Sequence, residues 1–134
     1  MRAMLDPRPL DWASRNGSLG ESIMIYITQG RYTQSAMKGM IANPEDRSEQ
    51  ARALFERAGL RMLSYYVTFG EYDFLIVNEG DMDLQSYMAA AVTAAASGGV
   101  SDLKTTVGMP AADMKGACEK AAATAAQYRA VGQG

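Results

Sequence analysis

The sequence predicts a small α+β domain, an antiparallel sheet in the order β-α-β-β-α-β followed by an extra C-terminal helix. Four short segments rich in β-branched and aromatic residues alternate with stretches of helical periodicity. Only Gly70-Glu71 separates the second and third strand-like segments, and an Ala-rich stretch follows the fourth. The 134 residues are enough for one hydrophobic core and too few for two independent ones.

Changes in composition divide the chain into three parts. Residues 1–22 contain two prolines and two glycines among polar neighbours, show no periodicity and are predicted to form an irregular N-terminal arm. Residues 23–109 hold the strand-like and helical segments and are predicted to form the domain proper. Residues 110–134 begin with Pro110, which suits the first position of a helix, and are predicted to form an Ala-rich helix and tail.

The first half of the domain is predicted to contain one strand and a helical segment with a pause. Ile23–Thr28 is β-branched and aromatic, which is typical of a buried strand. The pause falls at Asn43-Pro44, where Asn43 can cap a new helix and proline suits its first turn, and Gly59 ends that helix. The apolar positions with helical spacing are Ala36, Met37, Met40, Ile41, Ala51, Leu54, Phe55 and Ala58.

The middle of the domain is predicted to form a hairpin. Leu60–Phe69 and Tyr72–Asn78 flank Gly70-Glu71, and glycine at the first position of a two-residue loop predicts a type II′ turn. Such a loop fixes the register of the two strands. One side is almost wholly apolar and is predicted to face the helices; it carries Leu63, Tyr65, Val67, Phe69, Tyr72, Phe74, Ile76 and Asn78.

A second helix and a fourth strand complete the domain. Asp81 or Asp83 can cap the helix, Gly98-Gly99 ends it, and the strand follows at Val100–Val107. The helix has apolar positions at Leu84, Tyr87, Met88, Ala91, Val92 and Ala95. The resulting element order is the split βαβ pattern of the ferredoxin-like fold, in which right-handed crossovers place both main helices on one face of the sheet.

The other face of the sheet is predicted to be an interface. It mixes polar residues with Met24, Tyr26, Tyr66, Leu75 and Val77, which is too apolar for a face exposed to water. The simplest cover is the same face of a second copy, because two-fold dimers are the commonest assemblies. The sequence therefore predicts a homo-oligomer, at least a dimer, with the C-terminal helix as the alternative cover.

Composition excludes several classes of function. The chain has no histidine, so it holds no His-based nucleophile relay or His-ligated metal. Its net charge is -2 with scattered basic residues, which argues against nucleic acid as a partner. No phosphate loop, dinucleotide fingerprint or metal-ligand spacing is present, and no cofactor is expected. No apolar run has the length of a signal peptide or membrane span, so the expected location is cytoplasmic, without a membrane partner.

One segment resembles a known family. Tyr65–Glu79, with Gly70, Tyr72 and Asp73, is similar to the GYD domain family, and the likeness covers most of Met24–Met109. The resemblance implies a ferredoxin-like fold of the dimeric α+β barrel kind. It implies no activity, because the function of the family is not established.

Five residues are candidates for a ligand site, namely Tyr26, Arg47, Tyr66, Thr68 and Asp73. Asp73 and Tyr66 are the candidates for acid–base catalysis, because burial could raise the pKa of a carboxyl beside a phenol. Asp73 could instead accept hydrogen bonds from backbone in the turn, and the tyrosines could simply pack. Arg47 could bind an anion or form a local ion pair.

The sequence favours an oligomeric binding or assembly module, with a small molecule or a protein as the partner. The first alternative is a cofactor-independent enzyme of the isomerase or oxygenase type, working in an inter-subunit or sheet-face pocket. The second alternative is a purely structural subunit of a larger complex.

Overall fold

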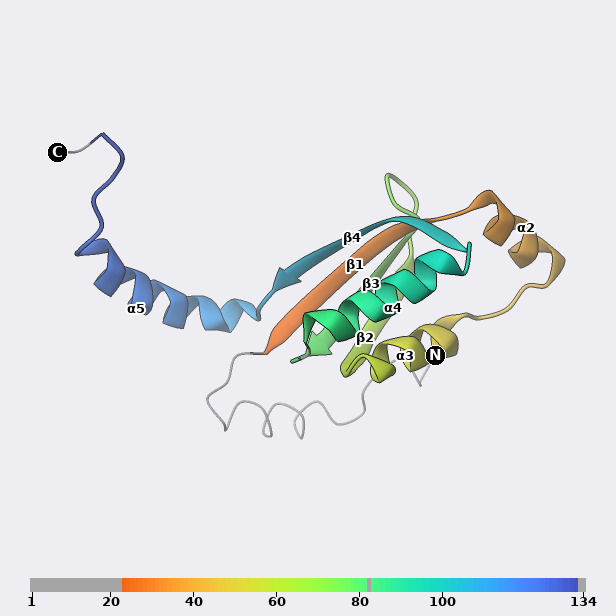
Figure 1. The fold of residues 1–134 in the computed structure, drawn as a ribbon, viewed down its shortest axis with the longest axis horizontal. Coiled ribbons are helices and arrows are strands. Elements are labelled where there is room, and N and C mark those ends of the chain that lie inside the picture. Colours follow the sequence, from red (N-terminus) through yellow and green to blue (C-terminus); the bar gives the residue numbers. More distant parts are fainter. Residues whose placement is uncertain (1–22, 82, 133–134) are drawn as a thin grey trace.

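The chain forms a four-stranded antiparallel sheet with a layer of helices on one face (Figure 1). The structure, a computed structural model, describes residues 23–81 and 83–132, so the predicted N-terminal arm lies outside the described residues. The elements are β1 Met24–Tyr32, α2 Gln34–Ala42, α3 Ser48–Arg57, β2 Leu60–Val67, β3 Phe74–Gly80, α4 Leu84–Ala96, β4 Val100–Gly108, the 3-10 turn η2 Ala111–Asp113 and α5 Met114–Ala125. The strand order is β2-β3-β1-β4, which is close to the ferredoxin-like arrangement that the sequence predicts.

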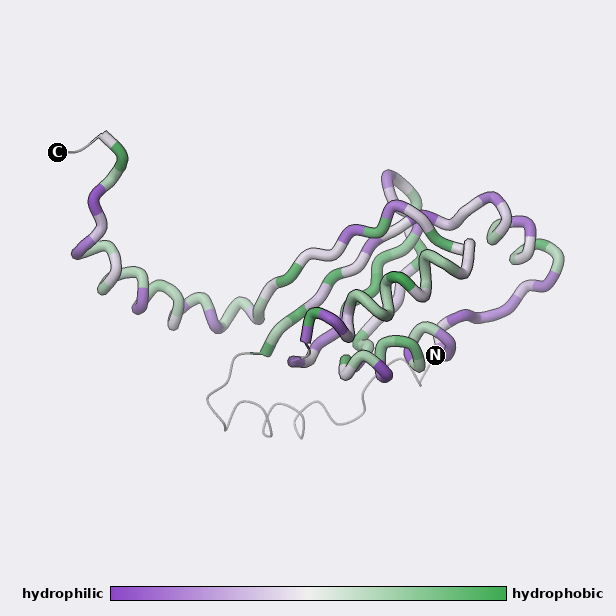
Figure 2. The backbone as a smooth tube through the Cα atoms, in the orientation of Figure 1, coloured by the Kyte–Doolittle hydropathy of each residue, from purple (hydrophilic) through white to green (hydrophobic). Residues whose placement is uncertain are grey.

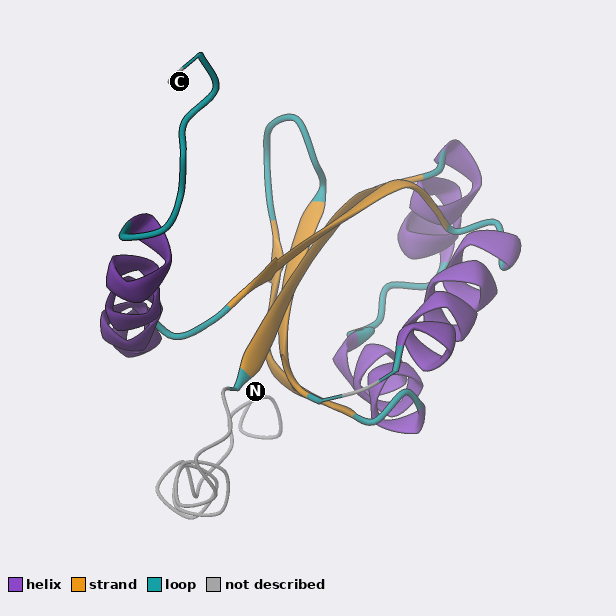
Figure 3. Ribbon diagram, turned by 60° about the vertical axis from the view of Figure 1, so that its left-hand side comes forward, coloured by secondary structure: helices purple, strands orange, loops and turns teal. Residues whose placement is uncertain are grey.

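The helices α2, α3 and α4 cover one face of the sheet, whereas α5 lies on the opposite side (Figure 3). The face turned away from α2, α3 and α4 is called the outer face below. The strand registers place on it the side chains of Ile25, Ile27, Gln29, Tyr66, Leu75 and Val77. Helix α5 makes its principal contacts with η2, and hydrophobic and hydrophilic positions alternate along it (Figure 2).

Local signals in the sequence set most of the helix ends. The Thr33 side chain caps α2 by accepting a hydrogen bond from the backbone of Ala36, at 3.1 Å. Asp83 caps α4 through Ser86 in the same way. Gly59 (φ 88°) follows the end of α3 in the left-handed region that favours glycine.

The predicted start of α3 is wrong. Asn43 is the C-cap of α2, and residues 44–47 are not helical. The helix begins at Ser48, where the Asp46 carboxylate accepts a hydrogen bond from the Ser48 backbone at 2.9 Å. When a short side chain such as that of Asp46 accepts a hydrogen bond from backbone two residues ahead, the local chain favours a turn over a helix. The non-helical segment between α2 and α3 is therefore longer than the sequence predicts.

The hairpin has the predicted register near its loop, but not along its whole length. Val67 pairs with Phe74 and Tyr65 with Ile76, as expected. A bulge between Met62 and Ser64 then shifts the pairing by one residue. Met62 therefore faces the helices with 3% exposure, although the regular alternation predicts it on the outer face.

The bulge also brings Arg61 opposite Glu79, and the guanidinium donates a hydrogen bond to the carboxylate. Burial raises the pKa of Glu79 above its ordinary value, and the bond to Arg61 opposes that shift only in part.

The tip of the hairpin differs from the predicted type II′ turn. The strands end at Val67 and begin again at Phe74, and the Thr68 backbone N–H donates to the Asp73 carbonyl at 2.8 Å. Gly70 is not among the positive-φ glycines, whereas a type II′ turn needs positive φ at that position. Phe69, predicted on the helix face, is fully exposed in this loop.

The loop geometry predicts that Gly70→Val has little effect on stability. A Cβ added at Gly70 meets no atom within 4 Å, and the backbone there does not require glycine. We expect the free energy of unfolding to change by about 0.5 kcal/mol or less. Urea denaturation of parent and variant measures this change, and a loss of about 2 kcal/mol or more would show that the turn does use positive φ.

Tyr26 is on the opposite face from the one that the sequence predicts. It pairs with Asn78 across β1 and β3, is 5% exposed and packs with Phe55, Leu60 and Phe74 in the core cluster. The segment around Tyr26 is apolar at successive positions, so it has no alternation of apolar and polar residues that would show which side faces the helices.

Fewer residues of α4 are buried than its hydrophobic pattern predicts. Tyr87 and Ala90 are buried, whereas the larger Leu84, Met88 and Val92 are exposed at 74%, 49% and 58%. Apolar residues surround most of this helix, so periodicity alone does not identify the packed side (Figure 2).

Candidate functional site

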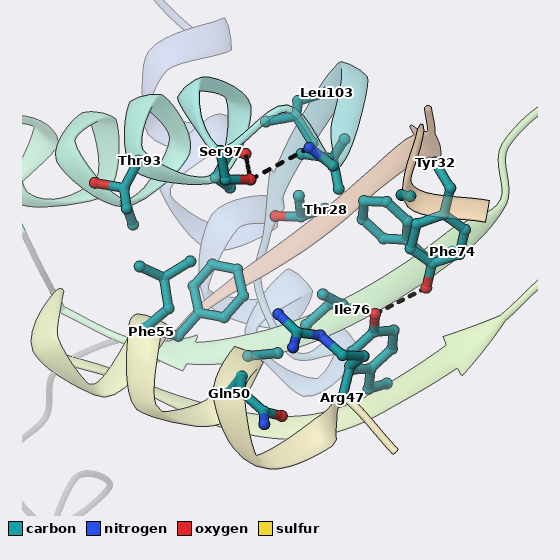
Figure 4. Close-up of a pocket in the computed structure, with 18 of the residues that line it drawn as sticks. Thr28, Tyr32, Arg47, Gln50, Phe55, Phe74, Ile76, Thr93, Ser97 and Leu103 are labelled. Atoms are coloured by element: carbon teal, nitrogen blue, oxygen red, sulfur yellow. Dashed lines mark hydrogen bonds between the residues drawn. The ribbon is translucent and has the colours of Figure 1, made fainter. Parts of the chain in front are cut away.

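A cavity of about 700 Å³ lies between the sheet and the helix layer (Figure 4). Thr28, Phe74 and Ile76 contribute to it from the centre of the sheet. Residues of α2, α3 and α4 line its other sides, among them Phe55 and Thr93. A volume of this size is in the range of small-molecule sites in proteins.

The cavity exists because the helices present small side chains to the sheet. Ala90, Ala91 and Ala94 of α4 line it, with Ala51 of α3 and Gly39 of α2. An alanine reaches only a short distance from the backbone, so helices held at this distance leave space that leucine or phenylalanine would fill. Leu84, Met88 and Val92 of α4 are exposed and do not line the cavity, whereas Tyr87 does.

Three hydroxyl groups form a cluster in the cavity lining. The Thr28 and Tyr87 hydroxyls are 2.6 Å apart, and Tyr87 also bonds Thr105 of β4. Thr28 and Thr105 are 3.4 Å apart. The cluster joins β1, α4 and β4, and it supplies donor and acceptor groups to a mainly apolar cavity.

A second polar group is the pair of phenols of Tyr32 and Tyr65, whose oxygens are 2.8 Å apart. Both rings pack on Phe74, with centroid distances of 5.2 Å and 6.3 Å. Burial is the main cause that raises the pKa of Tyr32 well above its usual value, and the hydrogen bond with Tyr65 adds to it. Tyr32 is therefore a neutral phenol at physiological pH.

Charged residues line the cavity beside α3. Arg47 precedes the helix and donates a hydrogen bond to Glu45 at 2.9 Å. The two side chains are 55% and 45% exposed, so the pair is a surface ion pair. Arg57, at the end of α3, also lines the cavity. Figure 4 shows Arg47 extending over the cavity beside Gln50 and Ile76.

The residues singled out from the sequence do not form one site. Arg47 lines the cavity, but the other four do not. Tyr26 stacks on Tyr87 in the core, with ring centroids 6.0 Å apart. Tyr66 is 59% exposed on the outer face, and Thr68 donates to the Tyr72 carbonyl in the hairpin loop at 2.7 Å.

Asp73 binds backbone groups, which is the alternative to catalysis that the sequence suggested for this residue. Its carboxylate accepts a hydrogen bond from the Tyr32 backbone at 2.9 Å, and its own N–H donates to the Gly30 carbonyl at 2.8 Å. These bonds tie the hairpin loop to the end of β1, the strand that carries Tyr32. Asp73 and Tyr66 share no cavity within the described part of the chain, so their pairing as acid and base has no geometric support.

The five ligand candidates from the sequence do not include Thr28, Tyr32, Tyr65, Tyr87 and Thr105, which line the cavity. The hairpin register already places Tyr65 on the helix face, which is the one signal that could have found the phenol pair. Nothing in the spacing of Thr28, Tyr87 and Thr105 brings them together, because the contact depends on how α4 crosses β1 and β4.

A search of residues 23–81 and 83–132 finds no group of three or more cysteine or acidic residues that could hold a metal ion. In the same residues, no helix has the length and apolar character needed to cross a membrane.

Comparison with known proteins places the fold and its hairpin in a family. The family model described as the GYD domain matches residues 26–118, which include β1 from its third residue, the other three strands and the beginning of α5. Searches of curated proteins and of solved structures gave no match. Since the family model matches more than half of the chain, this protein belongs to the GYD domain family.

Proposed function

We propose that the protein is an oligomeric binding module that holds a small, mainly apolar molecule between its sheet and its helix layer. The observation that carries this proposal is the cavity of about 700 Å³, in which apolar walls surround two clusters of hydroxyl groups. Ligand sites commonly combine such walls with a few polar groups that fix the orientation of the ligand.

The proposed oligomer uses the outer face. Ile25, Ile27, Leu75 and Val77 are only partly buried there. A sheet face with this much apolar surface favours an interface, and a second copy can cover it by two-fold symmetry. This arrangement leaves the cavity, on the opposite face of the sheet, within each subunit.

Experiments can also distinguish the two alternatives from the sequence, a purely structural subunit and an enzyme. A purely structural subunit would have no ligand in the cavity. An enzyme would need reactive groups other than the Asp73 and Tyr66 pair. The cytoplasmic location stays a prediction from the sequence.

A neutral fluorescent probe tests the proposed site. N-phenyl-1-naphthylamine should bind the parent protein with increased fluorescence, because it is apolar and carries no charge. Ala94→Phe places a ring in the cavity and should weaken binding by at least about tenfold. Ala89→Phe makes the same change on the exposed side of α4 and should leave binding unchanged.

Circular dichroism and urea denaturation establish that both variants fold. Absence of probe binding to the parent, or equal loss in the two variants, would contradict the cavity as the binding site.

A further inference from the structure

We infer that the ligand of the cavity is an aromatic carboxylic acid, whose ring lies against Phe55 and Phe74 and whose carboxylate is bound by Arg47 and the Tyr32–Tyr65 pair. This inference rests on the proposed function and adds the chemical class of the ligand.

The charge of the cavity lining favours an anion. Its charged residues are Arg47, Arg57 and Glu45, so two guanidinium groups face one carboxylate. The chain as a whole has a net charge of -2, so the positive balance is a local property of this lining. A cationic ligand would be repelled by this balance, whereas an anion would be attracted.

Arg47 can exchange its present partner for a ligand at small cost. Its bond to Glu45 joins two side chains that are about half exposed, and exposed ion pairs contribute little to stability. A guanidinium group binds a carboxylate through two parallel N–H donors, which a neutral alcohol cannot match. The carboxylate of a bound ligand that presents both oxygens to the guanidinium can therefore compete with Glu45, which accepts one hydrogen bond from Arg47 at 2.9 Å.

The phenol pair supplies a hydrogen-bond donor next to this cation. Two hydroxyls that share one hydrogen bond use one proton between them, so the second proton remains available to an acceptor. Among the described residues neither hydroxyl has another hydrogen-bond partner. Arg47, Tyr32 and Tyr65 line the same cavity, and the inferred carboxylate lies between the guanidinium and the phenol pair.

The walls favour a ring. Phe74, on which both phenol rings pack, lines the cavity, and Phe55 lines it from α3 (Figure 4). Leu103 and Ile76 complete the apolar surface, and aromatic side chains pack well against flat ring systems. A ring between these side chains can direct its carboxylate toward Arg47.

Calorimetric titration with two small probes tests the inference on the full chain at neutral pH. The probes are 2-naphthoate and 2-naphthalenemethanol, which share the ring system and differ in the charged group. We expect 2-naphthoate to bind about tenfold more tightly than the alcohol. Arg47→Gln should remove this preference without changing the affinity for the alcohol.

One further variant serves as a control and another as a second test. Arg129→Gln makes the same change of charge at an exposed residue outside the cavity lining, and the preference should survive. Glu45→Gln removes the competing carboxylate, and the affinity for 2-naphthoate should rise by about two- to fivefold.

The outcomes separate this inference from the proposed function. Equal affinity of the parent for the two probes, or a preference that survives Arg47→Gln, would overturn the carboxylate assignment while leaving the cavity as a binding site. Binding of N-phenyl-1-naphthylamine without binding of either small probe would also overturn it. Failure of all the probes would remove both the inference and the proposed function.

Discussion

Leu75→Lys is expected to convert the proposed oligomer into monomers, or to prevent it from folding as an assembly. Leu75 lies on the outer face, between Gln29 of β1 and Tyr66 of β2, and is half-buried within one subunit. A second copy would bury it further, and a two-fold axis would bring in an identical charge. An unpaired ammonium removed from water costs several kcal/mol, which is comparable to the free energy of a modest interface.

Light scattering at micromolar concentration measures the mass of the parent and of the variant. The matched control is Ile41→Lys, because Ile41 is an 81% exposed apolar residue of α2, on the other side of the sheet. This control should keep the parent mass. A monomeric parent would contradict the proposed oligomer, and a dimer that persists in Leu75→Lys would locate the interface elsewhere.

Phe74→Ala is expected to lower the free energy of unfolding by about 3–5 kcal/mol. Phe74 is 4% exposed, and the rings of Tyr32 and Tyr65 pack on it. Its ring also lies directly over Gly30, since a Cβ built on Gly30 would come within 2.6 Å of the Phe74 Cζ. Removal of the ring leaves a void next to an existing cavity.

Phe69→Ala gives the matched control for this prediction. The two phenylalanines are five positions apart, but Phe69 is fully exposed in the hairpin loop. Its truncation should change the free energy of unfolding by about 0.5 kcal/mol or less. Urea denaturation measures both variants. Similar losses in the two would mean that the loop packs on the domain, and no loss in either would contradict the packing described for Phe74.

The sequence identified the order of the elements because each depends on local signals. Asp83 caps α4, and Gly59 follows α3 with a positive φ. The pairing of Tyr65 with Ile76 followed from the short separation between two strand-like segments. These features depend on residues that are close in the chain, so a short stretch of sequence is enough to predict them.

The tertiary structure decided which side of an element faces the core. Tyr26 lies in a strand whose successive residues are apolar, and the side it faces was set by pairing with β3. The bulge beside Met62 likewise moved that residue from the outer face to the core. A single-residue change of register reverses the face of every side chain beyond it, and no local signal marked this one.

The candidate site depended most on the tertiary structure. From the sequence, Arg47 was a candidate for anion binding or for a local ion pair, and the structure shows its ion pair with Glu45. Thr28, Tyr87 and Thr105 come together only where α4 crosses two strands. The cavity itself results from alanines such as Ala90 and Ala94, which a hydrophobic pattern counts as core residues. Such a pattern shows only that a side chain is apolar. A cavity depends on the space that small side chains leave unfilled between two layers, and other contacts set the distance between those layers.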